Sequence, residues 1–223
     1  PASQAADSGA EVLLNLNASP YRQGKCQTRE VEVAQRVSET GLAVVYVNLV
    51  GGQDELVFDG GSFAMSQQGQ KVSSAAVWES ALQPVKIMRE DTRDIVLTGQ
   101  LATKPSELAM IYQGLVTGLR DYIEKNNFPS VVIGLSGGID SAMTLALAVD
   151  AIGADNVKTV MMPSQFTAQI SLDDAQEMAA RLKVSHSVIA IDDVFAQFNN
   201  SLAAQFEGTE IDTTEENIQA RCR

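Results

Sequence analysis

The sequence predicts an α/β protein whose C-terminal half forms a doubly wound parallel sheet. First, apolar β-formers at 131–133 are followed by a glycine-rich stretch, and a helical pattern begins at Ala142. Second, a long helical pattern at 106–125 precedes these strand residues. Third, strand and helix patterns alternate beyond the glycines, with a strand and loop at 157–164, a helix at 171–184 and a strand at 186–192. Such alternation is typical of parallel sheets, whose ligands lie at the carboxyl ends of the strands.

The first hundred residues contain shorter segments, some with the hydrophobic pattern of a helix and others with that of a strand. Helix 28–40 places Val33, Ala34 and Val37 on one face and ends at Gly41. Strand patterns occupy 12–17 and 42–50, a turn, short strand and turn follow at 51–61, and a hairpin around Gln68 and Gly69 spans 62–72. Between Pro84 and Pro105 the sequence becomes charged, and we expect an irregular connection between two domains there.

Composition and charge exclude several classes of function. The 223 residues are 45% hydrophobic and carry a formal net charge of −12, which argues against unaided nucleic-acid binding. No run of 18 apolar residues exists, so we expect no membrane span. Cys26 and Cys222 lie far apart without metal-ligand spacing, which indicates a reducing, cytoplasmic location. The chain lacks an initiator Met and stops within a helical pattern, so we expect it to be an internal fragment.

The residues VVIGLSGGIDS, at 131–141, predict an anion site. Backbone N–H groups of a glycine-rich turn converge where a helix begins, and the helix N-terminus adds partial positive charge. No Lys follows Gly138 as in P-loop NTPases, and the glycine spacing differs from that of dinucleotide-binding loops. The alternative is a turn in which Asp140 and Ser141 only cap the helix.

Several motifs resemble those of one family. SGGIDS is similar to the pyrophosphatase loop of ATP pyrophosphatases, and FPSVVIGLSGGIDSAMTLALAVDAIG, MMPSQFTAQISLDDA and TEENIQARCR resemble the synthetase domain of NAD⁺ synthetases. GAEVLLNLNASPYRQGK and VNLVGGQDELVFDGGS resemble the later half of the nitrilase-like glutaminase domain fused to it. The resemblance implies the C-terminal part of a nitrilase-like α-β-β-α sandwich at 1–95, a linker at 96–105, and the first part of a doubly wound, adenine nucleotide alpha hydrolase-like ATP pyrophosphatase domain at 106–223.

The resemblance also implies a reaction. ATP adenylates deamido-NAD with release of pyrophosphate, ammonia displaces AMP, and glutamine hydrolysis supplies the ammonia. ATP and Mg²⁺ are the implied cofactors, and we expect a homo-oligomer in the full-length protein. Other ATP pyrophosphatase amidotransferases are the alternative within enzymes, and a non-catalytic fragment that binds nucleotide at most is the alternative outside them. We expect this chain by itself to be inactive.

Single residues acquire roles from the same resemblance. Ser19 and Lys25 match glutamine contacts, although Lys25 could also be a solvated lysine at a helix start. Asn217 matches a contact with deamido-NAD, and Arg221 would neutralise phosphate or only complement the end of its helix. Asp140 would hold Mg²⁺. The residues expected to bind ATP are Gly134, Leu135, Ser136, Gly137, Gly138, Ile139, Asp140 and Ser141.

No catalytic residue of the glutaminase is assigned within this chain. Nitrilase-like glutaminases use a Cys nucleophile, a Glu base and a Lys that stabilises the oxyanion, and the nucleophile motif would lie upstream of Pro1. Cys26 directly follows Lys25 instead, so we expect an inert thiol. His186 is expected to be structural. In the loop 165–170, Gln165 and Phe166 depart from the basic residue and Tyr expected for adenine contacts.

Overall fold

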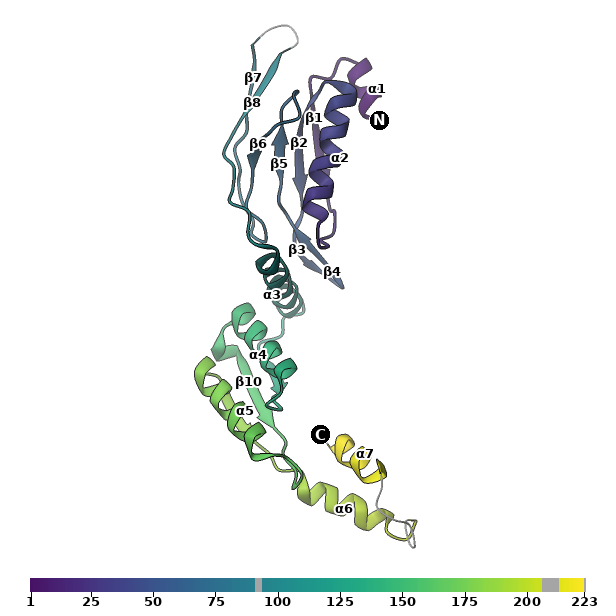
Figure 1. Cartoon of the computed structure of the whole chain (residues 1–223), viewed down its shortest axis with the longest axis vertical. Coiled ribbons are helices and arrows are strands. Elements are labelled where there is room, and N and C mark those ends of the chain that lie inside the picture. Colours follow the sequence, from purple (N-terminus) through teal and green to yellow (C-terminus); the bar gives the residue numbers. More distant parts are fainter. Residues whose placement is uncertain (91–93, 206–212, 223) are drawn as a thin grey trace. The chain divides into compact units, whose positions relative to one another are not determined.

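The computed structural model describes residues 1–90, 94–205 and 213–222. The chain divides into two compact units, Pro1–Lys125 and Asn126–Arg223, and most of their elements are labelled in Figure 1. The domain boundaries expected at 95 and 105 from family resemblance remain predictions. The compact first unit extends further, because the long helix before residue 126 packs on that unit's strands.

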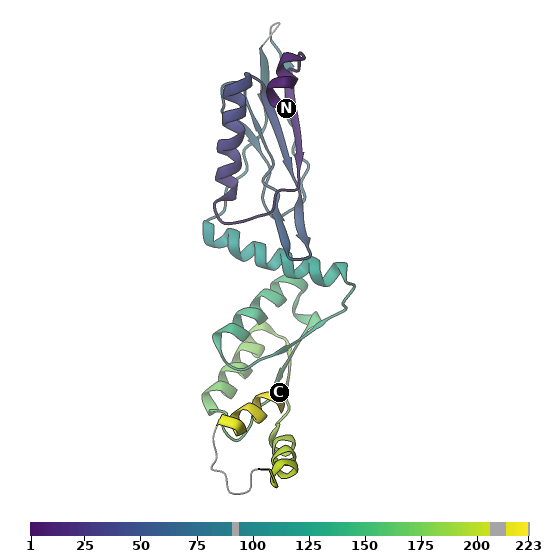
Figure 2. The same cartoon turned by 90° about the vertical axis from the view of Figure 1, so that its right-hand side faces the viewer.

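The first unit is built around a four-stranded mixed sheet of order β1-β2-β5-β6, in which β1 and β2 are parallel and the other neighbours antiparallel. Helix α2 covers one face of this sheet (Figure 2). The unit's elements are α1 (Ala2–Asp7), β1 (Val12–Asn17), α2 (Lys25–Thr40), β2 (Ala43–Asn48), β3 (Val50–Gln53), β4 (Leu56–Asp59), β5 (Phe63–Met65), β6 (Lys71–Ser74), β7 (Lys86–Arg89), β8 (Ile95–Thr98) and α3 (Glu107–Lys125).

The core between α2 and the sheet is formed by buried side chains of both. Val33 and Val37 are one helical turn apart and both are buried. Tyr46 and Phe63 pair across β2 and β5, and their rings stack with centroids 5.1 Å apart. The valines and the two rings belong to one buried cluster, which holds the helix on the sheet.

A hairpin of β7 and β8 contributes to the second core of this unit. Ile95 and Leu97 on β8 are buried with Ala43 and Ala64 of the central strands. The expectation of an irregular segment between Pro84 and Pro105 is therefore wrong. Strands of four residues carry too little alternation to stand out among charged neighbours, and only the apolar partners show which side chains are buried.

A second hairpin, β3 and β4, packs against α3 through glycine. A Cβ at Gly52 would lie 3.2 Å from the Gly118 Cα, so the close approach favours glycine on the strand. The Gly52 N–H donates to Asp121 Oδ2 (2.7 Å), and Lys125 Nζ donates to the Gly52 carbonyl. We expected a turn at residues 51–52, but the pair belongs to β3.

The second unit contains a three-stranded parallel sheet of order β11-β10-β9. The predicted parallel sheet is thus confirmed. Its elements are β9 (Val131–Gly134), α4 (Ile139–Ile152), the 3₁₀ turn η1 (Ala154–Asn156), β10 (Val157–Met161), α5 (Gln169–Leu182), β11 (Ser185–Val188), α6 (Asp192–Leu202) and α7 (Thr213–Cys222).

Helices α4 and α5 contact each other and pack on the sheet. Because the three strands follow one another across the sheet, right-handed connections place both helices on the same face. The buried residues of the two helices are Leu145, Ala148 and Ala151 on α4 and Ala175 and Ala179 on α5. Winding on both faces remains a prediction. Among the described helices, none is long and apolar enough to cross a membrane.

Candidate functional sites

The glycine-rich loop connects β9 to α4 at the carboxyl end of the sheet. The Leu135 N–H donates to the Val160 carbonyl (2.9 Å), so the hydrogen bonding between β9 and β10 continues to the first residue of the loop. Gly138 then has extended backbone angles and precedes α4, which begins at Ile139 and not at Ala142 as expected. The helix N-terminus therefore opens onto the loop, as an anion site requires.

Two serines tie this loop together. The Ser141 hydroxyl donates to the Gly138 carbonyl (3.0 Å) and accepts from the Ser136 N–H (3.2 Å). The Ser136 hydroxyl accepts from the Gly138 N–H (3.3 Å) and lies 3.0 Å from the Ser141 hydroxyl. Hydroxyl and amide groups thus gather within a few residues and bond to one another, which fixes the conformation of the loop.

Gly137 is required by the geometry of this loop. Its φ of +80° lies in the region that side chains disfavour, and a Cβ there would lie 2.3 Å from the Ser171 carbonyl oxygen. Ser171 belongs to the first turn of α5, so the loop packs directly against the backbone of the next helix. Residues separated widely in sequence therefore hold the anion loop in place.

Asp140 occupies the first turn of α4 and is exposed. No side chain caps the N-terminus of α4, so the alternative in which Asp140 and Ser141 only cap the helix is not supported. Among the described residues, the Asp140 carboxylate has no hydrogen-bond partner, and no group of three or more His, Cys, Asp or Glu side chains could hold a metal. One carboxylate with phosphate oxygens and water is nevertheless a donor set that Mg²⁺ accepts.

A cavity of about 190 Å³ lies at the ends of β9 and β10. Its lining comprises Gly134, Leu135, Ser136, Val160, Met161, Met162 and Thr167. Three residues of the predicted ATP site thus line this cavity. Thr167, which the sequence reasoning did not identify, contributes a hydroxyl that also accepts from the Ser164 N–H (3.0 Å).

Helix α7 contacts the loop that follows β10. The Gln219 side chain donates to the Ser164 hydroxyl, and Ser164 itself is buried. Asn217 and Arg221 are on the same helix and both are exposed. The structure therefore places the helix with the two predicted deamido-NAD contacts beside the segment that borders the anion loop. Gln219 makes this connection and was not identified from the sequence.

In the first unit, Ser19 is held by two side chains. The Ser19 N–H donates to Asn48 Oδ1 (2.8 Å), while its carbonyl accepts from Arg29 Nη2 (2.8 Å) and Asn48 Nδ2 (3.2 Å). Arg29 Nε donates to the Ser19 hydroxyl (3.2 Å). Arg29 in turn pairs with the fully buried Asp59. The sequence analysis named Ser19, whose glutamine contact stays a prediction, but did not name Arg29, Asn48 or Asp59, which hold it.

Lys25 is the first residue of α2, which begins here and not at Thr28 as expected. Its side chain is half-buried, and within the described ranges its ammonium has no hydrogen-bond or ion-pair partner. Lys25 and Arg29 are one helical turn apart and so share a face of α2. The arrangement leaves a cation on the same helix face as the group that contacts Ser19.

Cys26 does not have the environment of a nucleophile. Its thiol donates to Asp59 Oδ2 (2.9 Å). Burial, and then the hydrogen bond and negative charge of Asp59, raise the pKa of the Cys26 thiol to about 11. A neutral thiol at physiological pH is a poor nucleophile, in agreement with the expectation of an inert cysteine.

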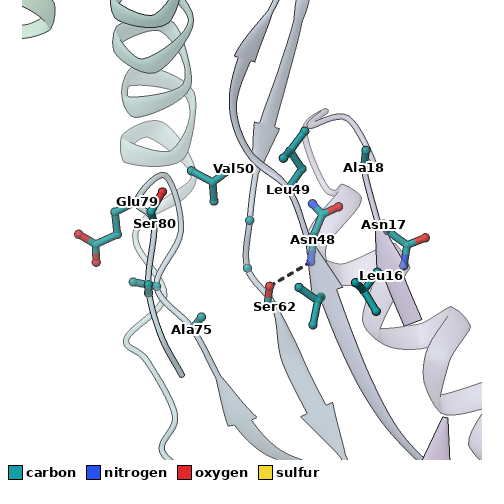
Figure 3. A pocket seen from close by; sticks show the side chains of 15 residues that line it. Leu16, Asn17, Ala18, Asn48, Leu49, Val50, Ser62, Ala75, Glu79 and Ser80 are labelled. Carbon is teal, nitrogen blue, oxygen red and sulfur yellow. Dashed lines mark hydrogen bonds between the residues drawn. The ribbon is translucent and has the colours of Figure 1, made fainter. Parts of the chain in front are cut away.

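A cavity of about 420 Å³ lies at the carboxyl ends of β1 and β2 (Figure 3). Asn48 and Ala18, the sequence neighbour of Ser19, line it together with the polar side chains of Asn17, Ser62, Glu79 and Ser80. The Asn48 N–H donates to the Ser62 hydroxyl (3.0 Å) within this lining. Asn48 therefore links this cavity to Ser19, while neither Ser19 nor Lys25 is among its lining residues.

His186, which is expected to be structural, lies on β11 outside these sites. Its Nδ1 lies 2.9 Å from the Thr159 hydroxyl, with which it is paired across β10 and β11. Neither residue lines the cavity at the anion loop.

A parallel sheet, a glycine loop at the end of its first strand and a helix that begins in that loop define an α/β protein of the kind whose ligands lie at the carboxyl ends of the strands. The NAD synthase family model matches residues 111–223. The chain belongs to this family. Membership of it disfavours the amidotransferases of other ATP pyrophosphatase families.

Relatives and solved structures match both units. A glutamine-dependent NAD(+) synthetase of Rhodobacter capsulatus is 43% identical over 218 residues, 98% of this chain and 40% of the relative. One from Xylella fastidiosa is 44% identical over 96% of this chain and 39% of its own length. The structure of the Acinetobacter baumannii synthetase in complex with ADP superposes with a TM-score of 0.90 at 44% identity, covering 99% of this chain and 41% of that one. The chain thus spans about 40% of the length of the curated relatives it matches.

Proposed function

We propose that this chain is part of a glutamine-dependent NAD(+) synthetase, which amidates deamido-NAD with ATP and glutamine-derived ammonia through an adenylated intermediate. The observation that carries the proposal is that both compact units, and not the synthetase region alone, match such an enzyme at 43% identity. The anion loop agrees with a reaction in which pyrophosphate leaves as an anion.

In this proposal, ATP binds at Gly134–Ser141. Backbone N–H groups and the serine hydroxyls would hold the phosphates where the N-terminus of α4 adds positive potential. Asp140 would hold Mg²⁺, which when bound supplies charge neutralisation to the leaving pyrophosphate. The cavity at the ends of β9 and β10 would take part of the nucleotide, since it adjoins the loop. Asn217 and Arg221 on α7 would contact deamido-NAD.

The first unit would belong to a nitrilase-like glutaminase domain, part of an α-β-β-α sandwich. Ser19 and Lys25 would bind glutamine, because a hydroxyl and an unpaired cation are suited to the charged end of an amino acid. Cys26 would not be the nucleophile, because its thiol donates to the buried Asp59 and burial raises its pKa. The catalytic Cys, Glu and Lys would come from sequence outside these residues. The formal net charge of −12 agrees with small-molecule substrates and no nucleic acid, and we propose a cytoplasmic homo-oligomer.

The test is a turnover assay on the whole protein that carries this chain. With ATP, Mg²⁺ and deamido-NAD, NAD should form with either glutamine or ammonia. Lys25→Ala should raise the glutamine requirement while ammonia-driven synthesis persists, because only the glutamine site loses its cation. Lys86→Ala, an exposed lysine of the same unit, is the matched control and should change neither.

Two results would contradict the proposal. One is an absence of NAD formation with both nitrogen sources, and the other is an equal loss with both in Lys25→Ala, which would make Lys25 structural. Residues 1–223 alone should give no steady turnover, which separates the whole enzyme from a nucleotide-binding fragment.

A further inference from the structure

We propose that Arg29 is a positioning residue of the glutamine site, which orients the Ser19 hydroxyl as a donor to the α-carboxylate of glutamine. This inference rests on the proposed function, and it adds both a residue and an orientation of the ligand. Arg29 would not touch glutamine. It would act through Ser19.

Ser19 has little conformational freedom. Its N–H, carbonyl and hydroxyl all bond to side chains of Arg29 and Asn48, which come from α2 and β2. The backbone of a loop residue is thereby held from two elements of the core. Ordered loops at binding sites avoid the entropic cost of fixing the loop when the ligand arrives.

Arg29 itself is fixed by a buried partner. Its side chain is 3% exposed and that of Asp59 0%, and the two form a bidentate pair at 2.9 and 2.8 Å. The same guanidinium uses Nε for the Ser19 hydroxyl and Nη2 for the Ser19 and Pro20 carbonyls. Only a planar fork of five donors serves these groups together, and a lysine ammonium cannot.

The contact with Arg29 sets the hydrogen-bonding direction of the Ser19 hydroxyl. An arginine has no acceptor, so the contact with Arg29 Nε makes the hydroxyl oxygen the acceptor and leaves its proton for another partner. A hydroxyl that accepts from a cation is polarised toward donating. It therefore suits a carboxylate oxygen better than an ammonium. Lys25, one turn before Arg29 on α2, adds a cation of the right sign for the same group.

The experiment compares glutamine with its α-amide, in which the α-carboxylate is replaced by a neutral amide, as glutaminase substrates of the whole protein. The readout is the ratio of the two kcat/KM values, which reports recognition of the carboxylate and is not moved by a loss of folded enzyme. We expect Ser19→Ala and Arg29→Lys each to reduce this ratio by about tenfold or more, the effect of one charge-assisted hydrogen bond. Ammonia-driven NAD synthesis should persist in both variants.

Arg36→Lys is the matched control, because Arg36 lies on the same helix in an exposed pair with Glu39. It should leave the ratio unchanged. Ser19→Ala keeps the backbone contacts, so it tests the orientation even if Arg29→Lys fails to fold. An unchanged ratio in Ser19→Ala would overturn the carboxylate assignment. If the ratio falls in Ser19→Ala but not in a folded Arg29→Lys, the positioning role is wrong. A wild-type protein that releases no glutamate from glutamine would contradict the proposed function itself.

Discussion

Replacement of Gly137 by alanine should disrupt the anion loop far more than the same change at Gly138. Gly137 has a φ of +80°, and the strain of an alanine in this region is about 1–2 kcal/mol. The new Cβ would also lie 2.3 Å from the Ser171 carbonyl oxygen and 2.8 Å from its Cα, so the loop or the first turn of α5 must shift. Overpacking of this kind costs about 1–3 kcal/mol, which brings the expected loss to about 2–5 kcal/mol.

Gly138→Ala provides the internal control. Gly138 has a φ of −89°, which any residue adopts, and its Cβ would meet only the Ser136 hydroxyl, at 3.4 Å. Neither glycine nor alanine can cap the N-terminus of α4 with its side chain. The expected loss of unfolding free energy is therefore about 1 kcal/mol or less. Both variants add one methyl group to the same loop.

The assay uses the whole protein with either substitution. Urea unfolding gives the unfolding free energy of each variant, and calorimetric titration gives its affinity for ADP. The unfolding free energy should fall more in Gly137→Ala, and its affinity for ADP should fall with the displaced loop. Equal unfolding free energies for the two variants would refute the reasoning, because the contact with Ser171 would then carry no energy. The stability measurement does not depend on the proposed function.

Three further predictions follow from single contacts. Asp59→Asn should lower the unfolding free energy by about 3–5 kcal/mol, since it leaves the Arg29 guanidinium buried without its counterion. Glu39→Gln, in an exposed pair, is the control and should change the unfolding free energy by less than about 1 kcal/mol in the same urea titration. In a Cys222→Ser variant, alkylation of Cys26 should be slow at pH 8 and accelerate only as the pH approaches 11, because the folded pKa lies above the ordinary value; fast alkylation at pH 8 in the folded chain would contradict this. Asp140→Asn should lower adenylation by the whole protein about 100-fold, as measured by pyrophosphate release, and unchanged release would exclude a role at the reacting phosphates.

Much of the fold could be predicted because hydrophobic period is a local property. The strand at 12–17, the hairpin around Gly69, the helix after Pro105 and the strand before the glycine loop were all correct. Helix starts were less accurate. Both α2 and α4 begin after a glycine without a side-chain cap, so the usual Ser, Thr, Asp or Asn signal is absent at Gly24 and Gly138.

The errors concern strands that are stabilised by contacts with residues distant in sequence. Strand β3 contains Gly51 and Gly52, which read as a turn until α3 is seen to pack against them. Strand β8 becomes recognisable only when Ile95 and Leu97 meet the central sheet. Both are tertiary effects on four-residue segments, where local preference is weak.

The sequence by itself determined the α/β class and the order of strand, glycine turn and helix at 131–152, because these elements are specified by neighbouring residues. It also indicated Ser19 and Lys25. Only the tertiary structure decided which distant residues hold the glycine loop and Ser19 in place. The contacts of Gly137 with Ser171 and of Arg29 with Asp59 join residues far apart in sequence, and no local pattern encodes which distant groups the folding of the core will bring together.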